Sequence, residues 1–530
     1  MSRLRPIALA TAAPPPSEPA RSEAFDAIIV GSGAGGFTVA IGLARLGRSV
    51  ALVEAGDVGG DCTNVGCIPS KTLLDLSARL RASGLAPGGP AWVDAARDAL
   101  AEVRRRRDAV RAHDEGLLAA QPRITLVRGR GRLVAAGAVE VATADGARSL
   151  RAPRVVLATG ARPLRIELPG LLPDRVLTNE ELFELPAPPT HLAVLGGGPI
   201  GVEMATAFVR LGSRVTLVEA LPRLLPGGEP EASDLVAASL RRLGVDVRLG
   251  VRAVGFDAAS GTLALAADAP AGVASAASPP EVATTAADAA SGADPAAPVA
   301  GVERVLMALG RRPNADDLTT DPGGLTALGI RLGRQGIVTD GSHRTGLPGV
   351  YAIGDVTERA KFTHAANAQG RRLVRHLIAP WLPLLPEGDY PAVTFGEPEV
   401  AQIGPPLAAL YRRWHPDAIV SQRVALAELD RGRVSGLDAG FALLHARRFS
   451  GRLLSATVVG PHAGELIQLL TWAQRRRVSL WQLSRHVVAY PTLSEAIKQA
   501  ADAFFFATLA ALPRELMAYL RHRWRRPRAG

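Results

Sequence analysis

Cysteine and aromatic residues are scarce in this sequence. Its 530 residues include 2 cysteines, and Phe, Trp and Tyr together account for 4%. Because bases stack on aromatic side chains, so few of them argue against nucleic-acid binding, although the formal net charge is +11. A cysteine content this low excludes a secreted fold stapled by disulfides and indicates a reducing compartment.

Long apolar runs are also missing. No stretch reaches the roughly 18 apolar residues that a membrane-spanning helix needs. Residues 1–23 are rich in Pro and Ala, and their apolar part, residues 6–13, is weak for a signal peptide and is followed by prolines. We therefore expect a disordered lead over residues 1–23 and a cytoplasmic protein.

Lysine is nearly absent, because arginine supplies almost all of the 61 basic residues. The only lysines are Lys71, Lys361 and Lys498. Arginine is spread along the whole chain with abundant Ala, Gly and Pro, so the positive charge reflects a composition bias rather than a binding site. Against that bias, a lysine at position 71 points to a specific role.

The two cysteines, Cys62 and Cys67, lie in one stretch, 59–71, that also holds Lys71. A zinc site needs four ligands, and the stretch offers no further Cys and no nearby His. A structural disulfide across so short a loop would remove little entropy from the unfolded chain. Both readings are therefore weak, and we expect no metal site.

A redox-active disulfide fits this stretch better. Residues five positions apart lie about 140° apart on a regular helix, so the two cysteines can bond only where the helix start is distorted. The glycines of the stretch and Pro69 permit such a distortion. A helix N-terminus and a nearby cation also stabilise a thiolate.

Two segments carry the pattern of a dinucleotide-binding turn. In the first, an apolar strand at 26–30 leads into Gly31-x-Gly33-x-x-Gly36, a helix to about residue 46, and a strand that ends at Glu54. Such glycines let the backbone approach a pyrophosphate at the helix N-terminus, and the acid accepts a ribose hydroxyl.

The second copy begins with a strand at 192–195. It continues with Gly196-x-Gly198-x-x-Gly201, a helix, and a strand that ends at Glu219, with the same spacing from first glycine to acid. Two copies predict two bound dinucleotides and an α/β fold with two Rossmann-like domains.

The rest of the chain suggests further units. Residues 266–300 are almost free of large apolar side chains and predict a flexible low-complexity insertion. A strand at 349–353 leads into the turn Gly354-Asp355, and alternating segments from about residue 390 predict a separate sheet with helices.

The last part, 501–520, predicts an apolar helix that is broken at Pro513 and followed by a basic cluster. An apolar face beside arginines suits an anionic membrane surface, so we expect either peripheral membrane contact or packing on a dimer.

Together these motifs resemble the pyridine nucleotide–disulfide oxidoreductases, the family of dihydrolipoyl dehydrogenase, glutathione reductase and mercuric reductase. The resemblance covers about residues 25–500. It rests on the cysteine stretch, both glycine turns, the turn at 354–355, and the segments 460–465 and 491–495, which look like the family's dimerisation domain. It implies a homodimeric FAD enzyme that uses NAD(P)H.

The resemblance also implies a domain order. Residues 24–175 and 313–385 would form the FAD-binding domain, and residues 176–312 the NAD(P)-binding domain. Residues 388–500 would form an α+β dimerisation domain, which completes the partner's active site, and residues 501–530 a tail.

The family's roles carry over to the matching positions. Cys67 would be the thiol nearer the flavin, Cys62 the thiol that attacks the substrate, and Lys71 would pair with Glu203 beside the flavin ring. The implied FAD contacts are Gly31, Gly33, Gly36, Glu54, Lys71, Thr159, Gly160, Gly354 and Asp355, and the implied NAD contacts are Gly196, Gly198, Gly201, Glu219 and Gly310. Glu219 favours NADH, because a carboxylate accepts a ribose 2′-hydroxyl and repels a 2′-phosphate.

One position departs from the family pattern. Disulfide-reducing members have a His directly before the C-terminal Pro-Thr, and a Glu behind it helps that His to shuttle protons. Here the position is Tyr490, while Pro491 and Glu495 remain. A Tyr with a pKa near 10 is ionised about one time in a thousand at neutral pH, and losing a general base costs roughly 10²–10⁴ in rate.

A tyrosine near the cysteine pair resembles mercuric reductase, in which a metal bound to thiolates needs no base. That enzyme also uses a C-terminal cysteine pair, which this chain lacks. We therefore expect a mercuric reductase-like enzyme that reduces a disulfide or a thiol-bound metal. Dihydrolipoyl dehydrogenase and a redox-sensing flavoprotein with low turnover are the alternatives.

Overall fold

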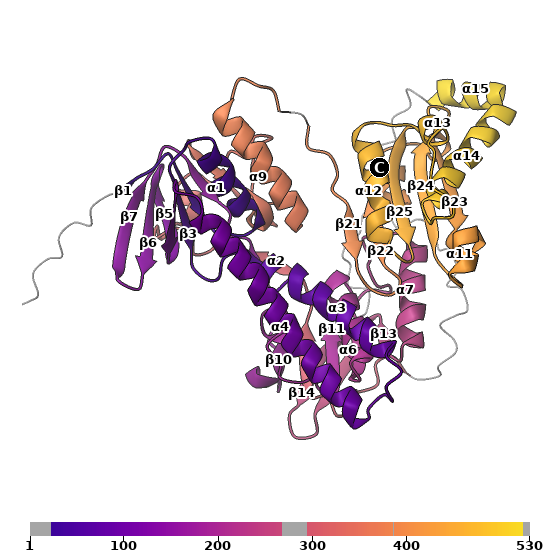
Figure 1. The fold of residues 1–530 in the computed structure, drawn as a ribbon, viewed down its shortest axis with the longest axis horizontal. Helices are drawn as coiled ribbons and strands as arrows, with labels where there is room; N and C mark the ends of the chain where they lie inside the picture. Colours follow the sequence, from indigo (N-terminus) through magenta and orange to yellow (C-terminus); the bar gives the residue numbers. More distant parts are fainter. Residues whose placement is uncertain (1–22, 268–293, 385, 523–530) are drawn as a thin grey trace, which may run out of the picture.

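The computed structural model describes residues 23–267, 294–384 and 386–522 (Figure 1). Two bodies are built on parallel sheets, and an antiparallel sheet with its helices forms a third body towards the C-terminus. The long helix α4 (Pro90–Ala119) runs from the first body to the second. The predicted α/β fold is confirmed.

The first body centres on a parallel sheet in the order β20-β8-β2-β3-β4. Strand β2 is buried at every position, as expected where helices cover both faces of a parallel sheet. Helices α1 (Ala34–Arg45) and α9 (Thr363–Ile378) pack together against it. The strands are β2 (Ala27–Val30), β3 (Val50–Glu54), β4 (Ile124–Arg128), β8 (Val155–Leu157) and β20 (Val350–Ala352).

A small sheet extends this body. Strands β5 (Arg130–Ala135), β6 (Ala138–Thr143) and β7 (Gly146–Arg151) are antiparallel, and β1 (Glu23–Ala24) pairs with β7 in parallel. The predicted disordered lead, 1–23, is therefore wrong at its last residue, because Glu23 pairs with β7 and its carboxylate accepts hydrogen bonds from Arg148 at 2.8 Å. Residues 1–22 lie outside the described residues.

The second body centres on a parallel sheet in the order β10-β16-β11-β12-β13. Helices α6 (Pro199–Arg210) and α7 (Pro230–Arg242) contribute buried residues to its core. The strands are β10 (Val176–Leu177), β11 (His191–Leu195), β12 (Arg214–Glu219), β13 (Asp246–Leu249) and β16 (Arg304–Met307).

The predicted insertion at 266–300 is wrong at both ends. Ala266 and Ala267 close strand β15 (Thr262–Ala267), which pairs with β14 (Val251–Asp257). Val299 exchanges two backbone hydrogen bonds with Leu263. Its side chain is buried in an apolar cluster of the second body, so this residue belongs to the folded domain rather than to an insertion. Residues 268–293 of the predicted insertion lie outside the described residues, and the described chain resumes at residue 294.

Helices that follow the cysteine stretch pack against the second body. Helix α3 (Cys67–Arg81) and α4 contribute Leu73, Leu100 and other apolar residues to the same core as β11 and α6. Trp92 of α4 donates its indole N–H to the carbonyl of Leu211 at 3.2 Å. The first residue of α3, Cys67, also lies 3.3 Å from the hydroxyl of Thr363 in α9, so contacts with both bodies position this helix.

The third body is an antiparallel sheet in the order β21-β22-β25-β24-β23. Helices α12 (Ala463–Arg475) and α14 (Glu495–Ala510) bury their apolar faces on it. The strands are β21 (Ala392–Thr394), β22 (Val400–Ile403), β23 (Ile419–Ala425), β24 (Phe441–Arg447) and β25 (Leu453–Val459). Shorter elements elsewhere are α2 (Gly60–Asn64), α5 (Asn179–Leu182), α8 (Gly324–Ala327), α10 (Leu407–Tyr411), α11 (Asp430–Val434), α13 (Leu480–Leu483), β9 (Ala161–Pro163), β17 (Arg311–Pro313), β18 (Leu332–Gly333) and β19 (Gly336–Ile337).

The chain turns at Ala511 after α14 and continues as α15 (Leu512–His522). The predicted break in the tail helix is confirmed, but it falls at Ala511, two residues before Pro513. Pro513 lies in the first turn of α15, where its missing N–H has no intrahelical partner to lose. Among the described residues, no single helix is long and apolar enough to cross a membrane. Only α14 and Leu512–Arg521 taken together, bent by 95°, have the length and composition.

Candidate active site

The first glycine turn joins β2 to α1. Gly31 has a φ of +103°, and a Cβ there would lie 2.4 Å from the carbonyl oxygen of Ala158. A Cβ on Gly36 would lie 1.9 Å from the carbonyl oxygen of Gly31, so only glycine lets α1 approach β2 this closely. Gly33 caps α1 without a side-chain hydrogen bond, which leaves backbone N–H groups at the helix start for a ligand.

Glu54 closes the first turn. One oxygen of its carboxylate accepts hydrogen bonds from the backbone N–H and the hydroxyl of Ser32 at 2.8 and 2.7 Å. The other accepts the backbone N–H of Gly56 at 2.7 Å. These bonds hold the acid at the carboxyl end of β3.

The second turn repeats this geometry. Gly196 has a φ of +108°, and a Cβ on Gly201 would lie 1.9 Å from the carbonyl oxygen of Gly196. Gly198 caps α6 without a side-chain hydrogen bond. The carboxylate of Glu219 accepts the backbone N–H groups of Gly197 at 2.6 Å and Leu221 at 2.7 Å.

A cavity of about 580 Å³ opens at the carboxyl ends of the first sheet. It reaches from the first glycine turn to the cysteine stretch, since Cys62 and Thr363 both line it. Of the FAD contacts implied by the sequence, it is lined by Gly31, Gly33, Glu54, Thr159, Gly160, Gly354 and Asp355. Gly36 and Lys71 are not among its lining residues.

The cysteines lie at the junction of two helices. Cys62 belongs to the short helix α2, and Cys67 begins α3 after a break at residues 65–66. A Cβ on Gly66 would lie 2.7 Å from the carbonyl oxygen of Asp61, so the break requires glycine there. Both cysteines are free thiols in hydrogen-bonding contact with each other.

The two thiols differ in acidity. The pKa of Cys67 is lowered to about 6 by the hydrogen bond from Cys62, and then by the hydroxyl of Thr363 and the charge of Lys71, which together outweigh burial. The pKa of Cys62 is raised, because it donates to Cys67 and because it is desolvated. The pair is therefore a thiolate at Cys67 and a thiol at Cys62 near neutral pH.

Lys71 and Glu203 meet as predicted. The ammonium of Lys71 lies 2.8 Å from one oxygen of the Glu203 carboxylate, which is buried. The other oxygen accepts the backbone N–H of Phe395 at 3.0 Å, and Lys71 lies 4.8 Å from the centre of the Phe395 ring. Phe395 follows β21, so the third body contacts this pair where α3 packs on α6 of the second. No motif in the sequence pointed to Phe395.

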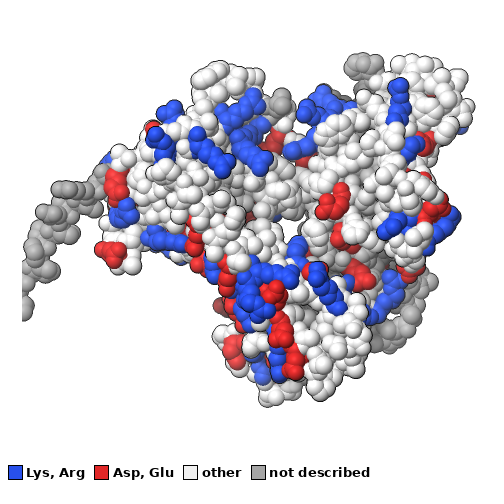
Figure 2. Space-filling view, in the orientation of Figure 1, with Lys and Arg blue, Asp and Glu red and all other residues white. Residues whose placement is uncertain are grey.

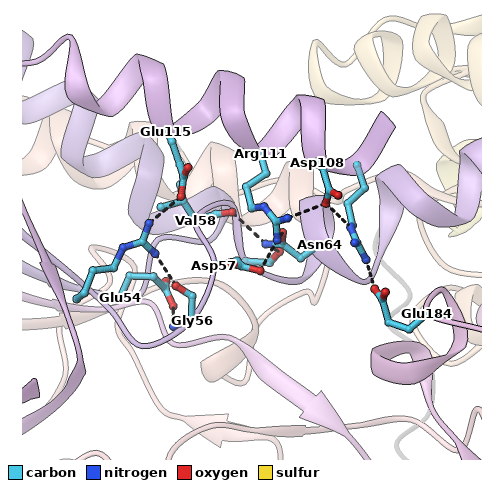
Figure 3. A network of polar contacts seen from close by, with 12 residues as sticks. Glu54, Gly56, Asp57, Val58, Asn64, Asp108, Arg111, Glu115 and Glu184 are labelled. Carbon is cyan, nitrogen blue, oxygen red and sulfur yellow. Dashed lines mark hydrogen bonds and ion pairs between the residues drawn. The ribbon is translucent and has the colours of Figure 1, made fainter. Parts of the chain in front are cut away.

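The cysteine stretch is also held from α4 (Figure 3). Arg111 donates to Asp57, to Asp108 at 2.6 Å and to the side-chain oxygen of Asn64 at 3.4 Å. Asn64 in turn donates to the carbonyls of Val58 and Gly60 at 3.0 Å. Arg111 thereby ties α2 to the loop that follows Glu54.

Other residues that pattern reasoning missed surround Asp355. Arg311 contacts the carboxylate of Asp61, and its Nε lies 3.8 Å from that of Asp355. Desolvation raises the pKa of Asp355, and the charges of Arg311 and Lys361 oppose that rise. No local pattern relates these positions, because the chain brings them together from distant segments.

Tyr490 and Glu495 lie in the third body, and neither lines the cavity of the single chain. Tyr490 is 69% exposed and donates its hydroxyl to the carboxylate of Asp430 at 2.8 Å. That hydrogen bond raises the pKa of Tyr490. One carboxylate oxygen of Glu495 is buried and has no hydrogen-bond partner among the described residues.

The comparisons with known proteins agree with this geometry. The model of the pyridine nucleotide-disulphide oxidoreductase family matches residues 25–370, and the model of that family's dimerisation domain matches residues 390–501. The chain belongs to this family. It is an FAD-dependent oxidoreductase that uses NAD(P)H, and the match to the dimerisation domain supports a homodimer.

Named relatives are dihydrolipoyl dehydrogenases. The chain is 32% identical to that of Chlorobaculum tepidum over 90% of its own length and 96% of the relative, and 29% identical to that of Geobacillus stearothermophilus over 90% and 95%. Among solved structures it is similar to LpdA from Mycobacterium tuberculosis, with a TM-score of 0.74, 27% identity, and coverage of 90% of this chain and 99% of the other. A Cu(II) complex of the HOCl-induced flavoprotein disulfide reductase RclA from Escherichia coli shares the fold, with a TM-score of 0.75, 24% identity, and coverage of 91% and 99%.

The residues present fit FAD. The cavity lies at the carboxyl ends of β2, β3 and β8, and the start of α1 has no side-chain cap, which leaves backbone N–H groups for a phosphate. A side chain on Gly31 or Gly36 would collide with backbone.

Proposed function

We propose that this enzyme is an NAD(P)H-driven reductase that passes electrons through Cys62 and Cys67 to a thiophilic metal ion, free or carried by a thiol. In this proposal the first turn with Glu54, Thr159, Gly160, Gly354 and Asp355 holds FAD. The second turn with Glu219 and Gly310 holds the nicotinamide nucleotide. Bound FAD carries an electron pair between the nicotinamide and the cysteines.

The chain's own residues keep the reduced pair ready. Lys71 and Thr363 favour the thiolate of Cys67, and Cys62 keeps the proton that the pair shares. The buried carboxylate of Glu203 holds the Lys71 ammonium beside them. An acceptor that takes electrons from the pair must therefore displace a proton from Cys62.

The hydrogen bond from Tyr490 to Asp430 carries the proposal. The Tyr490 hydroxyl donates in this bond, and the bond raises the pKa of Tyr490. Tyr490 therefore does not supply the base that a disulfide-reducing relative would use. A metal ion needs no such base, because binding by a thiol releases the proton. Closing the Cys62–Cys67 disulfide then frees two electrons, which reduce one ion twice or two ions once.

RclA, a protein of the same fold, forms a complex with Cu(II), which supports a metal as substrate. A dihydrolipoyl dehydrogenase is the second candidate, because the named relatives carry that activity in their names. It would need Glu495 or another group to replace the missing histidine. The unpartnered oxygen of Glu495 is the observation that favours it.

Two steady-state assays separate the candidates: oxidation of NADH and NADPH with Hg(II), Cu(II) or glutathione disulfide as acceptor, and reduction of NAD⁺ with dihydrolipoamide as donor. We expect turnover with a metal ion that is lost in Cys62→Ser, and little oxidation of dihydrolipoamide until Tyr490→His restores a base. Efficient dihydrolipoamide oxidation by the wild-type enzyme, with none of the metals reduced, would favour the second candidate and overturn the first.

A further inference from the structure

Helix α15 is amphipathic in the opposite sense to an ordinary surface helix. Its acidic residue Glu515 is buried against the third body, whereas Leu512, Leu516, Met517 and Leu520 are exposed. A surface helix normally turns its apolar stripe inwards and its charged residues outwards. The outward apolar face of α15 therefore calls for a partner.

Specific contacts fix this orientation. The carboxylate of Glu515 accepts two hydrogen bonds from Arg448, at 2.9 and 2.8 Å, and Arg448 also donates to the carbonyl of Asp417 at 2.6 Å. Tyr519 packs on Phe449 with 5.5 Å between the ring centres. Both oxygens of the buried Glu515 carboxylate accept from one guanidinium nitrogen of Arg448. Because rolling the helix would leave that carboxylate without its partner, α15 cannot simply turn its leucines inwards.

The end of α14 continues the apolar surface. Phe506 and Leu509 are exposed there, in the turns before the bend at Ala511. Figure 2 shows the surface over α14 and α15 as mostly uncharged in the view drawn. Exposed apolar clusters of this kind mark interaction sites.

Basic residues accompany this surface. Arg514 and Arg521 are exposed, and the sequence after His522 adds Arg523, Arg525, Arg526 and Arg528. No Asp or Glu follows Glu515 in the sequence. Among the described residues, the surface thus combines exposed apolar side chains with two exposed arginines, Arg514 and Arg521.

This surface lies beyond the segment that the family's dimerisation-domain model matches. The dimerisation-domain model ends at residue 501, before Phe506 and the whole of α15. The dihydrolipoyl dehydrogenases are matched over 95–96% of their own length by about 90% of this chain. We propose that α15 and the end of α14 dock the enzyme on an anionic lipid surface. The apolar residues would enter the boundary between headgroups and acyl chains while the arginines bind the headgroups.

The test uses the full-length holoenzyme and sedimentation with vesicles of phosphatidylcholine alone or mixed with phosphatidylglycerol. We expect binding to the mixed vesicles only, and weakening as salt is raised, because ions screen the arginines. Met517→Asp with Leu520→Asp should lower the partition coefficient by at least about tenfold, since each side chain loses its burial. Replacing the four arginines at 523, 525, 526 and 528 by glutamine should also weaken binding.

Leu332→Asp is the matched control, because Leu332 of β18 is 46% exposed and Leu520 is 48% exposed. It should leave binding unchanged. Sedimentation velocity and NADH oxidation check that each variant keeps its assembly and its active site. No binding to either vesicle, or equal binding to both, would overturn the proposal. So would dissociation of the dimer by the Met517→Asp, Leu520→Asp pair, which would assign this surface to a second copy of the chain.

Discussion

The hydroxyl of Thr363 lies 3.3 Å from the sulfur of Cys67, although 296 positions separate the two residues. Thr363 begins α9 of the first sheet's body, and Cys67 begins α3, which packs on the second. The contact therefore depends on how the two bodies are joined, and it stabilises the thiolate.

Thr363→Val should raise the pKa of Cys67 above about 6, because the thiolate loses a donor. A hydrogen bond to a charged group contributes about 1.5 kcal/mol, which corresponds to a pKa change of about one. The Cys67 thiolate next to the flavin should give a long-wavelength charge-transfer absorbance after anaerobic reduction. The pH dependence of that absorbance measures the pKa of Cys67. Thr363→Ser keeps the hydroxyl and should behave as the wild type; an unchanged pKa in the valine variant would contradict the assignment.

Lys71 and Glu203 should move the same pKa in opposite directions. The charge of Lys71 lowers the pKa of Cys67 and that of Glu203 raises it. Lys71→Met should therefore raise the pKa of Cys67, and Glu203→Gln should lower it, both read from the alkylation rate against pH. Lys71→Met also leaves the buried carboxylate of Glu203 with the backbone N–H of Phe395 as its remaining partner. The free energy of unfolding, measured with urea, should therefore fall by about 2–3 kcal/mol. If the pKa of Cys67 moved in the same direction in both variants, geometry rather than charge would control it.

Arg111 should control the stability of the disulfide. In Figure 3 it ties Asn64 of α2 to Asp57 and Asp108. Without it, α2 gains freedom and the effective concentration of Cys62 at Cys67 falls, which favours the dithiol. Arg111→Met should weaken the disulfide by about tenfold against a thiol buffer, or make its potential about 30 mV less negative.

Arg105→Met is the control for Arg111, because Arg105 lies on the same helix and pairs with Glu102 alone among the described residues. Equal potentials for the two variants would show that α2 is held by its remaining contacts, such as the bond from Thr63 to Asp114 at 3.3 Å.

His343 should make the folded state sensitive to acid. It is buried, neither ring nitrogen has a hydrogen-bond partner among the described residues, and burial lowers its pKa to about 4. Arg359 and Arg372 add to this shift, whereas Glu387 and Asp340 oppose it. Between pH 6.5 and 4 the unfolded chain binds the extra proton, so the stability contributed by neutral His343 falls by about 3 kcal/mol as the pH falls through that range.

Urea unfolding at several pH values measures this loss. His343→Asn should reduce the slope of the unfolding free energy against pH between pH 4 and 6.5. Asparagine is a suitable replacement because it tolerates the φ of +64° at this position. A slope that survives the substitution would assign the acid sensitivity to other groups.

Glu219 should make the enzyme prefer NADH. Its carboxylate is fixed by two backbone N–H groups and is buried, so a 2′-phosphate would meet a charge that cannot move away. We expect kcat/KM for NADH to exceed that for NADPH by at least about tenfold, and Glu219→Gln to narrow the ratio. A preference for NADPH would point to the exposed Arg223 as the dominant contact.

Local sequence patterns were enough to predict both glycine turns, the acids at Glu54 and Glu219, and the redox-active cysteine stretch. These are local features: a φ that only glycine adopts, a strand that ends in an acid, and a helix that starts at a thiol follow from neighbouring residues. The family resemblance added the pairing of Lys71 with Glu203, which no local rule contains.

The surroundings of those features depend on how distant segments pack together in the folded chain. Thr363 at Cys67, Phe395 at Glu203 and Asp430 at Tyr490 are contacts between distant segments, and no periodicity in the sequence encodes them. Val299 belongs to the core because Leu263 pairs with it across the predicted insertion. The same holds for the tail, where the apolar pattern predicts a helix but not its orientation. The ion pair between the buried Glu515 and Arg448 decides which face of α15 meets the solvent.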